Sequence, residues 1–392
     1  MTIPTQPPAA PHPKERLNAL HAVERLDALD ALRGLMALAV AVYHHAVWTH
    51  VFPAGSRLSN SVTVLGIHSV EGFFILSGFC FFHLYRGRSF TRGELRSFHV
   101  KRFFRIAPLY YLAFALTCAL DQSPGPLGAA RLAENLTLSF GLFHPNHSGV
   151  MGGWSIGVEY VFYLAFPLLL WIARLRGGML LMLLGLGALA LFYNYVRVPA
   201  TAEAARFNAY VLVPNHALLF VVGGALAALR ARISLRLTGV RVLLGTLLIA
   251  AGFQLWLTPF YDHFDMMMGH ARVVCLAACS AVVLLCGLSR SGVGRALRPL
   301  VGLGELSYAV YLLHPLAWSL IQRAGWLEGR PVALFVLGLT TTLALAALVH
   351  GLFERPLLRL GRRYAEGPTA GAKAAPSADP QTADGRPLLN VS

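Results

Sequence analysis

Charged residues are scarce in this sequence, and their scarcity excludes an ordinary soluble protein. Asp, Glu, Lys and Arg make up 13% of the 392 residues, about half of their share in soluble domains. Hydrophobic residues make up 56%, and the mean hydropathy is +0.58. This composition is typical of an all-α protein that crosses a membrane many times.

Cysteines are also few, and none of them forms a CxxC pair. All five lie within apolar segments, so they provide neither a disulfide framework nor a zinc motif. We therefore interpret them as packing residues and expect no metal site.

The first 25 residues lack an apolar run of signal-peptide type and are rich in Pro and Ala. We expect 1–25 and 364–392 to be disordered cytoplasmic tails on either side of a membrane domain at 26–363.

About ten apolar segments between the tails have the length and composition of membrane-spanning helices. They cover 30–50, 66–85, 104–120, 154–173, 179–196, 210–229, 242–258, 271–288, 302–321 and 332–353. With both termini in the cytoplasm, 26 of the 33 lysines and arginines fall on the cytoplasmic side, which agrees with the positive-inside rule. The net charge of +15 is thus explained by topology, so we expect the lipid bilayer rather than nucleic acid as a partner.

The first span carries an arginine and a histidine in otherwise apolar sequence. Arg33 and His44 are eleven residues apart, which on a helix means about 20° of azimuth and about 16 Å along the axis. Both side chains therefore lie on one face. A charge at the centre of a span costs about 3 kcal/mol, so this face is predicted to line a channel in the protein rather than to meet lipid.

Three further polar residues are predicted to lie in the outer half of the membrane together with His44. They are Glu71 in the second span, Glu159 in the fourth and His314 in the ninth. A carboxylate beside His44 would fix its tautomer and raise its basicity, as a general base requires. Each of the three also has a structural interpretation, as an interfacial acid, a partner of a buried arginine or a core histidine.

The segment between the second and third spans is strongly basic. Lys101, Arg102 and Arg105 stand at the start of the third span, with the two arginines three residues apart on one helix face. Planar guanidinium groups suit bidentate binding of phosphate, which predicts a nucleotide site. The alternative is that the cluster holds the segment inside and touches anionic lipid.

Six motifs follow one another along roughly residues 26–360: LDALRGLMALAVAVYHH, VEGFFILSGF, KRFFRIAPLYY, WSIGVEYVFYLAFP, LSYAVYLLHP and FERP. In this order the sequence resembles the acyltransferase-3 family of integral membrane acyltransferases, which includes O-antigen and exopolysaccharide O-acetylases. The resemblance implies that Arg33 and His44 are the functional pair of that family, and that Arg102 and Arg105 are its cytoplasmic RxxR.

Two positions depart from the family pattern. Tyr160 stands where a second Glu often follows Glu159, which removes a polar group and bears on acceptor binding. Glu71 stands in place of the usual Asp and keeps the charge.

The resemblance and the predicted depths together lead to one functional hypothesis. The protein would move an acyl group, with acetyl expected, from cytoplasmic acyl-CoA to a hydroxyl of an extracytoplasmic glycan such as O-antigen or exopolysaccharide, in a bacterial inner membrane. The predicted site consists of the donor-binding residues Arg33, Lys101, Arg102 and Arg105, the catalytic residues His44, Glu71 and Glu159, and the acceptor-binding residues Trp154, Ser155 and His314.

Two alternatives stay open at this point. The acceptor could be a macrolide-type small molecule or peptidoglycan instead, because no motif specifies it. A different class of protein, a glycan or lipid transporter, would use the buried charges as a proton relay. Besides the bilayer and the acceptor, glycan-assembly proteins are the expected partners.

Overall fold

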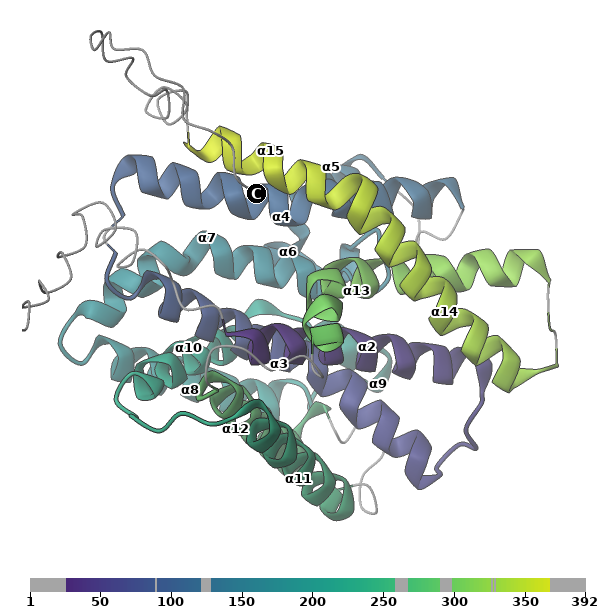
Figure 1. The fold of residues 1–392 in the computed structure, drawn as a ribbon, viewed down its shortest axis with the longest axis horizontal. Coiled ribbons are helices and arrows are strands. Elements are labelled where there is room, and N and C mark those ends of the chain that lie inside the picture. Colours follow the sequence, from purple (N-terminus) through teal and green to yellow (C-terminus); the bar gives the residue numbers. More distant parts are fainter. Residues whose placement is uncertain are drawn as a thin grey trace, which may run out of the picture.

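The computed structural model describes residues 26–88, 90–120, 128–257, 267–289, 298–325, 327 and 329–366 (Figure 1). No strand occurs in this described part, and one isolated β-bridge joins Leu237 to Ser289. The prediction of an all-helical protein is therefore confirmed. The predicted tail at 1–25, and the predicted tail at 364–392 beyond residue 366, lie outside the described residues.

Each of the ten segments predicted as spans falls on a helix. The helices are α2 (Asp27–Thr49), α3 (Arg57–Tyr85), α4 (Arg92–Ala119), α7 (Trp154–Arg174), α8 (Gly178–Phe192), α10 (Val213–Arg230), α11 (Gly239–Leu257), α12 (Gly269–Gly287), α13 (Arg298–Ala324) and α14 (Pro331–Val349). Two π-helical turns extend α8 and α14, and shorter helices connect or follow the long ones: η2 (Tyr193–Arg197), η5 (His350–Glu354), α5 (Ala129–Thr137), α6 (Phe140–Phe143), η1 (Pro145–His147), α9 (Glu203–Tyr210) and α15 (Arg355–Glu366).

Among the described residues, seven helical stretches are long and apolar enough to cross a membrane. Helix α2 falls outside this group because it carries Arg33, His44 and His45, and α4 because its first half is basic. The described apolar part of α11, Gly239–Gly252, is shorter than a span. The count of about ten spans and the cytoplasmic position of both termini stay predictions.

A capping box fixes the start of α4, the helix that carries the predicted phosphate-binding arginines. The Thr91 hydroxyl accepts a hydrogen bond from the backbone N–H of Glu94, and the Glu94 carboxylate accepts one from the N–H of Thr91. The hydrogen bonds from the Thr91 backbone and side chain lower the pKa of Glu94. This cap sets where the helix begins and hence which face presents Arg102 and Arg105.

Glycines let α2 and α13 approach along their backbones. A Cβ atom on Gly34 would lie 2.6 Å from the backbone nitrogen of Gly304, and one on Gly304 would lie 2.1 Å from the carbonyl oxygen of Asp30. Small residues of this kind allow close helix packing within membranes. The close approach brings the polar face of α2 against α13.

The arrangement of the helices places this pair inside the bundle. Figure 1 shows α2 and α3 in the middle, α4 beside α15 along one edge, and the pair α11 and α12 along the opposite edge. Helix α3 packs on α2 and α10, and α14 packs on α13 and α2. The polar face of α2 is therefore enclosed by protein.

Candidate active site

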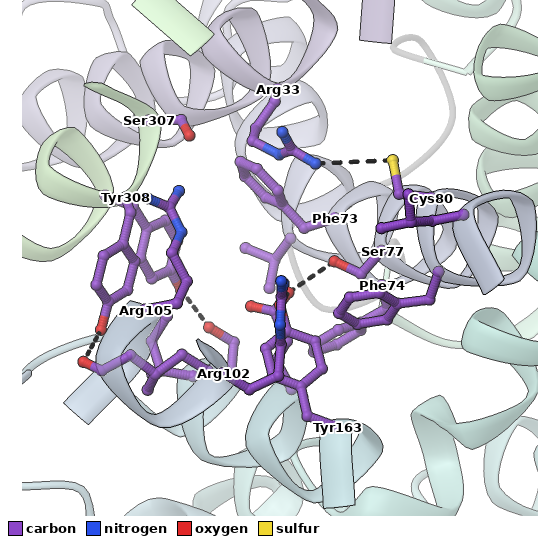
Figure 2. Close-up of a pocket in the computed structure, with 18 residues that line it drawn as sticks. Arg33, Phe73, Phe74, Ser77, Cys80, Arg102, Arg105, Tyr163, Ser307 and Tyr308 are labelled. Atoms are coloured by element: carbon purple, nitrogen blue, oxygen red, sulfur yellow. Dashed lines mark hydrogen bonds between the residues drawn. The ribbon is translucent and has the colours of Figure 1, made fainter. Parts of the chain in front are cut away.

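A cavity of about 330 Å³ lies among α2, α3, α4, α7 and α13. Figure 2 shows Arg33 entering this cavity from one wall and Arg102 and Arg105 entering from the opposite wall. Glu159 is the one carboxylate among its lining residues. Three guanidinium groups around one cavity favour an anionic ligand. We call it the basic cavity.

Arg33 is held by groups on two helices. Its Nη1 lies 3.0 Å from Oδ1 of Asp30, one turn earlier in α2, and its Nη2 lies 3.8 Å from Sγ of Cys80 in α3. The side chain is 26% exposed, so the ion pair is reached by solvent. The pairing lowers the cost of keeping a charge on this face of the helix.

Arg105 is fixed by η5, the π-helical turn that follows α14. Its Nη1 lies 2.6 Å from Oε1 of Glu354, whose side chain is buried, and its guanidinium lies 5.5 Å from the ring centroid of Tyr308. His350 Nδ1 lies 2.7 Å from the other oxygen of Glu354. The glutamate of the FERP motif therefore orients one arginine of the RxxR pair.

Arg102 has aromatic rather than acidic neighbours. The carbon of its guanidinium group lies 4.9 Å from the ring centroid of Phe81 and 5.8 Å from those of Phe98 and Tyr163. Within the described residues no carboxylate pairs with Arg102, and its buried Nε has no hydrogen-bond partner. Arg33 and Arg105 are each paired with a carboxylate, so Arg102 is the arginine of the three whose positive charge is best available to an anionic ligand.

A second cavity of about 540 Å³ contains His44 and Trp154 in its lining. We call it the outer cavity, since part of its wall comes from residues 145–152, between the third and fourth predicted spans, which the predicted topology places outside the membrane. Val70 and Tyr311 line both cavities. Both of these side chains are buried, so they form a partition between the arginines and the histidine.

Hydrogen bonds hold the partition in place. The hydroxyl of Tyr311 lies 2.7 Å from Oγ of Ser155 and donates to the carbonyl oxygen of Gly152 at 2.9 Å. Ser155 lines the basic cavity, at the first turn of α7. The predicted acceptor-binding residue Ser155 therefore contacts the partition.

His44 is joined to His314 across the interface of α2 and α13. Nδ1 of His314 lies 2.6 Å from the carbonyl oxygen of Tyr311, which can only accept, so in the neutral ring Nδ1 carries the proton. Nε2 of His314 is then an acceptor, 3.1 Å from Nδ1 of His44, and the Val40 carbonyl lies 3.0 Å from the same nitrogen. His44 therefore carries its proton on Nδ1 and its lone pair on Nε2.

Glu71 belongs to a buried ionic network in the structure. Its Oε1 accepts from Nε of Arg272 at 2.8 Å and from the hydroxyl of Tyr210 at 3.2 Å, and its Oε2 lies 2.8 Å from Nδ1 of His68. Arg272 also donates from Nη1 to Oδ1 of Asn215 at 2.6 Å. Both charged side chains are almost fully buried. The network ties α3 to α10 and α12.

Glu159 has hydroxyl partners. Its Oε1 accepts a hydrogen bond from Oγ of Ser77 at 2.6 Å and another from the hydroxyl of Tyr163. These contacts place Glu159 at the wall of the basic cavity. The prediction that Glu71 or Glu159 orients His44 stays a prediction.

The remaining predicted residues are distributed around the two cavities. Trp154 lines the outer cavity, whereas Lys101 and His314 line neither of them. His314 reaches the site through its hydrogen bond to His44.

Sequence analysis missed two charged residues of this region. Arg272 was counted among the charges predicted outside the membrane, but it lies in the first turn of α12 and is buried. The sequence signal for this ion pair was a single arginine in an apolar span, at the same predicted depth as Glu71. Glu354 was part of a quoted motif without a role, and its position directly after the last predicted span, 332–353, gave no indication of a contact with Arg105.

The fold and the cavities define an integral membrane protein with a polar site enclosed by helices. A family model of the acyltransferase-3 family, described as "Acyltransferase domain", matches residues 26–351. The chain belongs to this family and is an acyltransferase with membrane-spanning helices.

Two similar proteins have informative names. The chain is 29% identical over 335 residues to the Exopolysaccharide production protein ExoZ of Rhizobium meliloti (strain 1021), covering 80% of this chain and 95% of that protein. It is 29% identical over 363 residues to the Acyltransferase MdmB of Streptomyces mycarofaciens, covering 83% and 90%. No solved structure matches the chain.

Proposed function

We propose that this acyltransferase moves an acetyl group from acetyl-CoA in the cytoplasm to a hydroxyl group of a glycan on the other side of a bacterial inner membrane. The proposal is carried by one observation: the basic cavity and the outer cavity share Val70 and Tyr311. A thioester whose phosphates are bound among the arginines would need to pass only this partition to meet His44.

The donor would bind through its phosphates. Arg102 offers the least balanced charge, Arg105 is oriented by Glu354, and Arg33 stands on the opposite wall. Arginine forks bind phosphate oxygens in pairs, with the added strength of charge-assisted hydrogen bonds. Lys101 lies outside the lining, so its expected contribution is attraction of the anionic donor rather than a direct contact.

His44 would act as the base. Its Nε2 lone pair accepts the proton of the acceptor hydroxyl while the oxygen attacks the thioester carbonyl. The carbon–sulfur bond then breaks, the CoA thiolate leaves, and it takes up the proton from His44. In the covalent variant of this mechanism, Nε2 attacks the carbonyl first and the carbon–sulfur bond breaks, which releases the CoA thiolate. The acceptor oxygen then displaces the imidazole from the acyl carbon, and the proton of the acceptor hydroxyl passes to the thiolate.

The acceptor is proposed as a glycan because a relative with 95% of its length aligned is called an exopolysaccharide production protein. The outer cavity has an aromatic wall at Trp154 and polar groups at Asn146 and Asn208, a combination suited to a sugar ring. Membership of an acyltransferase family favours this reaction over transport.

Release of CoA thiol from acetyl-CoA by the purified protein in nanodiscs tests the proposal. The acceptor is the polysaccharide of the producing strain, stripped of its ester groups by mild base. We expect His44→Ala and Arg102→Ala to lose both thiol release and ester formation. His44→Ala removes general-base catalysis, which contributes about 10²–10⁴-fold, and Arg102→Ala removes a contact to the donor phosphates. His50→Asn at the end of the same helix and Arg359→Ala on α15 are the matched controls, because neither side chain lines the two cavities.

Full activity of His44→Ala would refute the proposed site, and acyl transfer without any CoA derivative would refute the donor. Rapid quenching with acetyl-CoA labelled in the acetyl group separates the two chemical routes. Label retained on the wild-type protein and absent from His44→Ala indicates the covalent route, and its absence from both indicates direct transfer.

A further inference from the structure

A cluster of three side chains that can bind a metal ion lies outside the two cavities. Oε1 of Glu134 on α5 lies 2.8 Å from Nδ1 of His144, and Oε2 of the same carboxylate lies 2.9 Å from Nδ1 of His147. The two imidazole rings are stacked, with centroids 4.5 Å apart. One ligand atom from each residue can thus be chosen with all three within 4.8 Å of one another.

Side chains of α5 hold the backbone at His147, one of the two histidines. Arg131 donates from Nε to the carbonyl of His147 at 3.0 Å and from Nη2 to that of Ser148 at 3.1 Å. Nδ2 of Asn135 donates to the carbonyl of His147 at 2.9 Å. The backbone at His147 is therefore held by bonds that do not involve the imidazoles, as expected of a preorganised site.

We propose that Glu134, His144 and His147 bind one Zn²⁺ ion, with water as the fourth ligand. Two imidazoles and one carboxylate are a ligand set that zinc accepts, at about 2.0–2.2 Å from each atom. In a tetrahedron of that size neighbouring ligand atoms are about 3.4 Å apart, so the hydrogen-bonded N–O pairs need to open by about half an ångström. Each neutral imidazole would move its proton from Nδ1 to Nε2 and offer the Nδ1 lone pair to the ion.

The charge and exposure of the cluster suit an ion taken from solution. Glu134 supplies a carboxylate, which brings a negative charge to the cluster. The imidazoles are 53% and 41% exposed, which leaves an entry path. This proposal departs from the expectation of no metal site, which depended on the cysteines alone.

The position of the cluster gives the ion a structural task. Pro145 and Asn146, which lie between the two histidines, line the outer cavity, as does Ser148. An ion that joins both histidines to α5 would hold this wall of the cavity in one conformation. The proposal concerns the wall and does not depend on the reaction assigned to His44.

Metal content of the full-length protein in nanodiscs provides the test, after removal of any polyhistidine tag and treatment with EDTA. The protein is incubated with zinc sulfate or magnesium chloride, separated from unbound metal and analysed by mass spectrometry. We expect about one zinc and no magnesium per chain, because imidazole ligands select zinc over magnesium. Saturation with zinc at about 100 times its Kd should raise the unfolding temperature by about 3 °C.

Three variants make the result decisive. The double variant His144→Ala/His147→Ala should bind no zinc, and Glu134→Gln, which keeps the side-chain shape, should bind it at least tenfold more weakly. His270→Ala is the control, because this exposed histidine bonds to Tyr195 away from the cluster. The proposal is overturned if wild type binds no more zinc than the double variant, or if Glu134→Gln binds zinc as tightly as wild type and the His270→Ala control do.

Discussion

Removal of the Arg272 side chain should destabilise the protein more than loss of any exposed arginine. The guanidinium is 2% exposed and its partner carboxylate on Glu71 is fully buried. Arg272→Ala deletes the 2.8 Å bond to Glu71 and the two bonds to Asn215, at 2.6 and 3.2 Å. The remaining carboxylate keeps its contacts with Tyr210 and His68, so a buried charge is left without its arginine counter-ion.

The loss in free energy of unfolding follows from leaving the buried Glu71 carboxylate without its counter-ion. Breaking a buried ion pair by removal of one partner costs about 3–5 kcal/mol. With the unfolding entropy usual for chains of this length, the unfolding temperature should fall by about 4–6 °C. Replacing both charges, in Glu71→Leu/Arg272→Met, should recover most of the loss because no charge then stays buried.

Thermal unfolding in nanodiscs, followed by tryptophan fluorescence, measures these shifts. Arg57→Met serves as the control, since this exposed arginine should contribute less than about 0.5 kcal/mol. An unfolding temperature of Arg272→Ala within about 1 °C of wild type would refute the reasoning. The activity of the stable double variant then tests the predicted catalytic role of Glu71: full activity assigns that residue to the core.

Two further predictions concern the interface of α2 and α13. Gly34→Ala would place a Cβ atom 2.6 Å from the backbone of Gly304, so the helices must separate; we expect a loss of about 1–3 kcal/mol in thermal unfolding, and unchanged stability would contradict the close packing. His314→Leu removes the acceptor of the His44 Nδ1–H bond, and kcat should fall about 10- to 100-fold, part of what a general base supplies, with KM for acetyl-CoA unchanged. His314→Gln retains an acceptor and should restore part of kcat; equal activity of Leu, Gln and wild type would exclude a positioning role.

The sequence predicted helices better than it predicted their ends. Hydropathy located the apolar centre of each span, but α3 begins at Arg57 rather than 66 and α4 at Arg92 rather than 104. The extra turns are polar and lie outside the apolar stretches. Their signals are local caps, Ser56 for α3 and the Thr91 box for α4, which hydropathy does not detect.

Helix periodicity was sufficient to predict which side chains share a face of one helix, but not which helices pack against each other. The spacing of Arg33 and His44, or of Arg102 and Arg105, follows from the period of a single helix. The bond from Arg105 to Glu354 joins residues 249 apart, and that from His44 to His314 joins residues 270 apart. Such pairs depend on which helices pack together and at what rotation, information that a single sequence does not contain.

The partition of Val70 and Tyr311 has a consequence for the cell. An open, water-filled bore through the bundle would conduct protons and ions and discharge the membrane potential, at about 2.3 kcal/mol per elementary charge for each 100 mV. Two buried side chains, one held by hydrogen bonds to Ser155 and Gly152, keep the halves of the site apart. In the proposed reaction, the acyl group would cross this partition without an open path for ions.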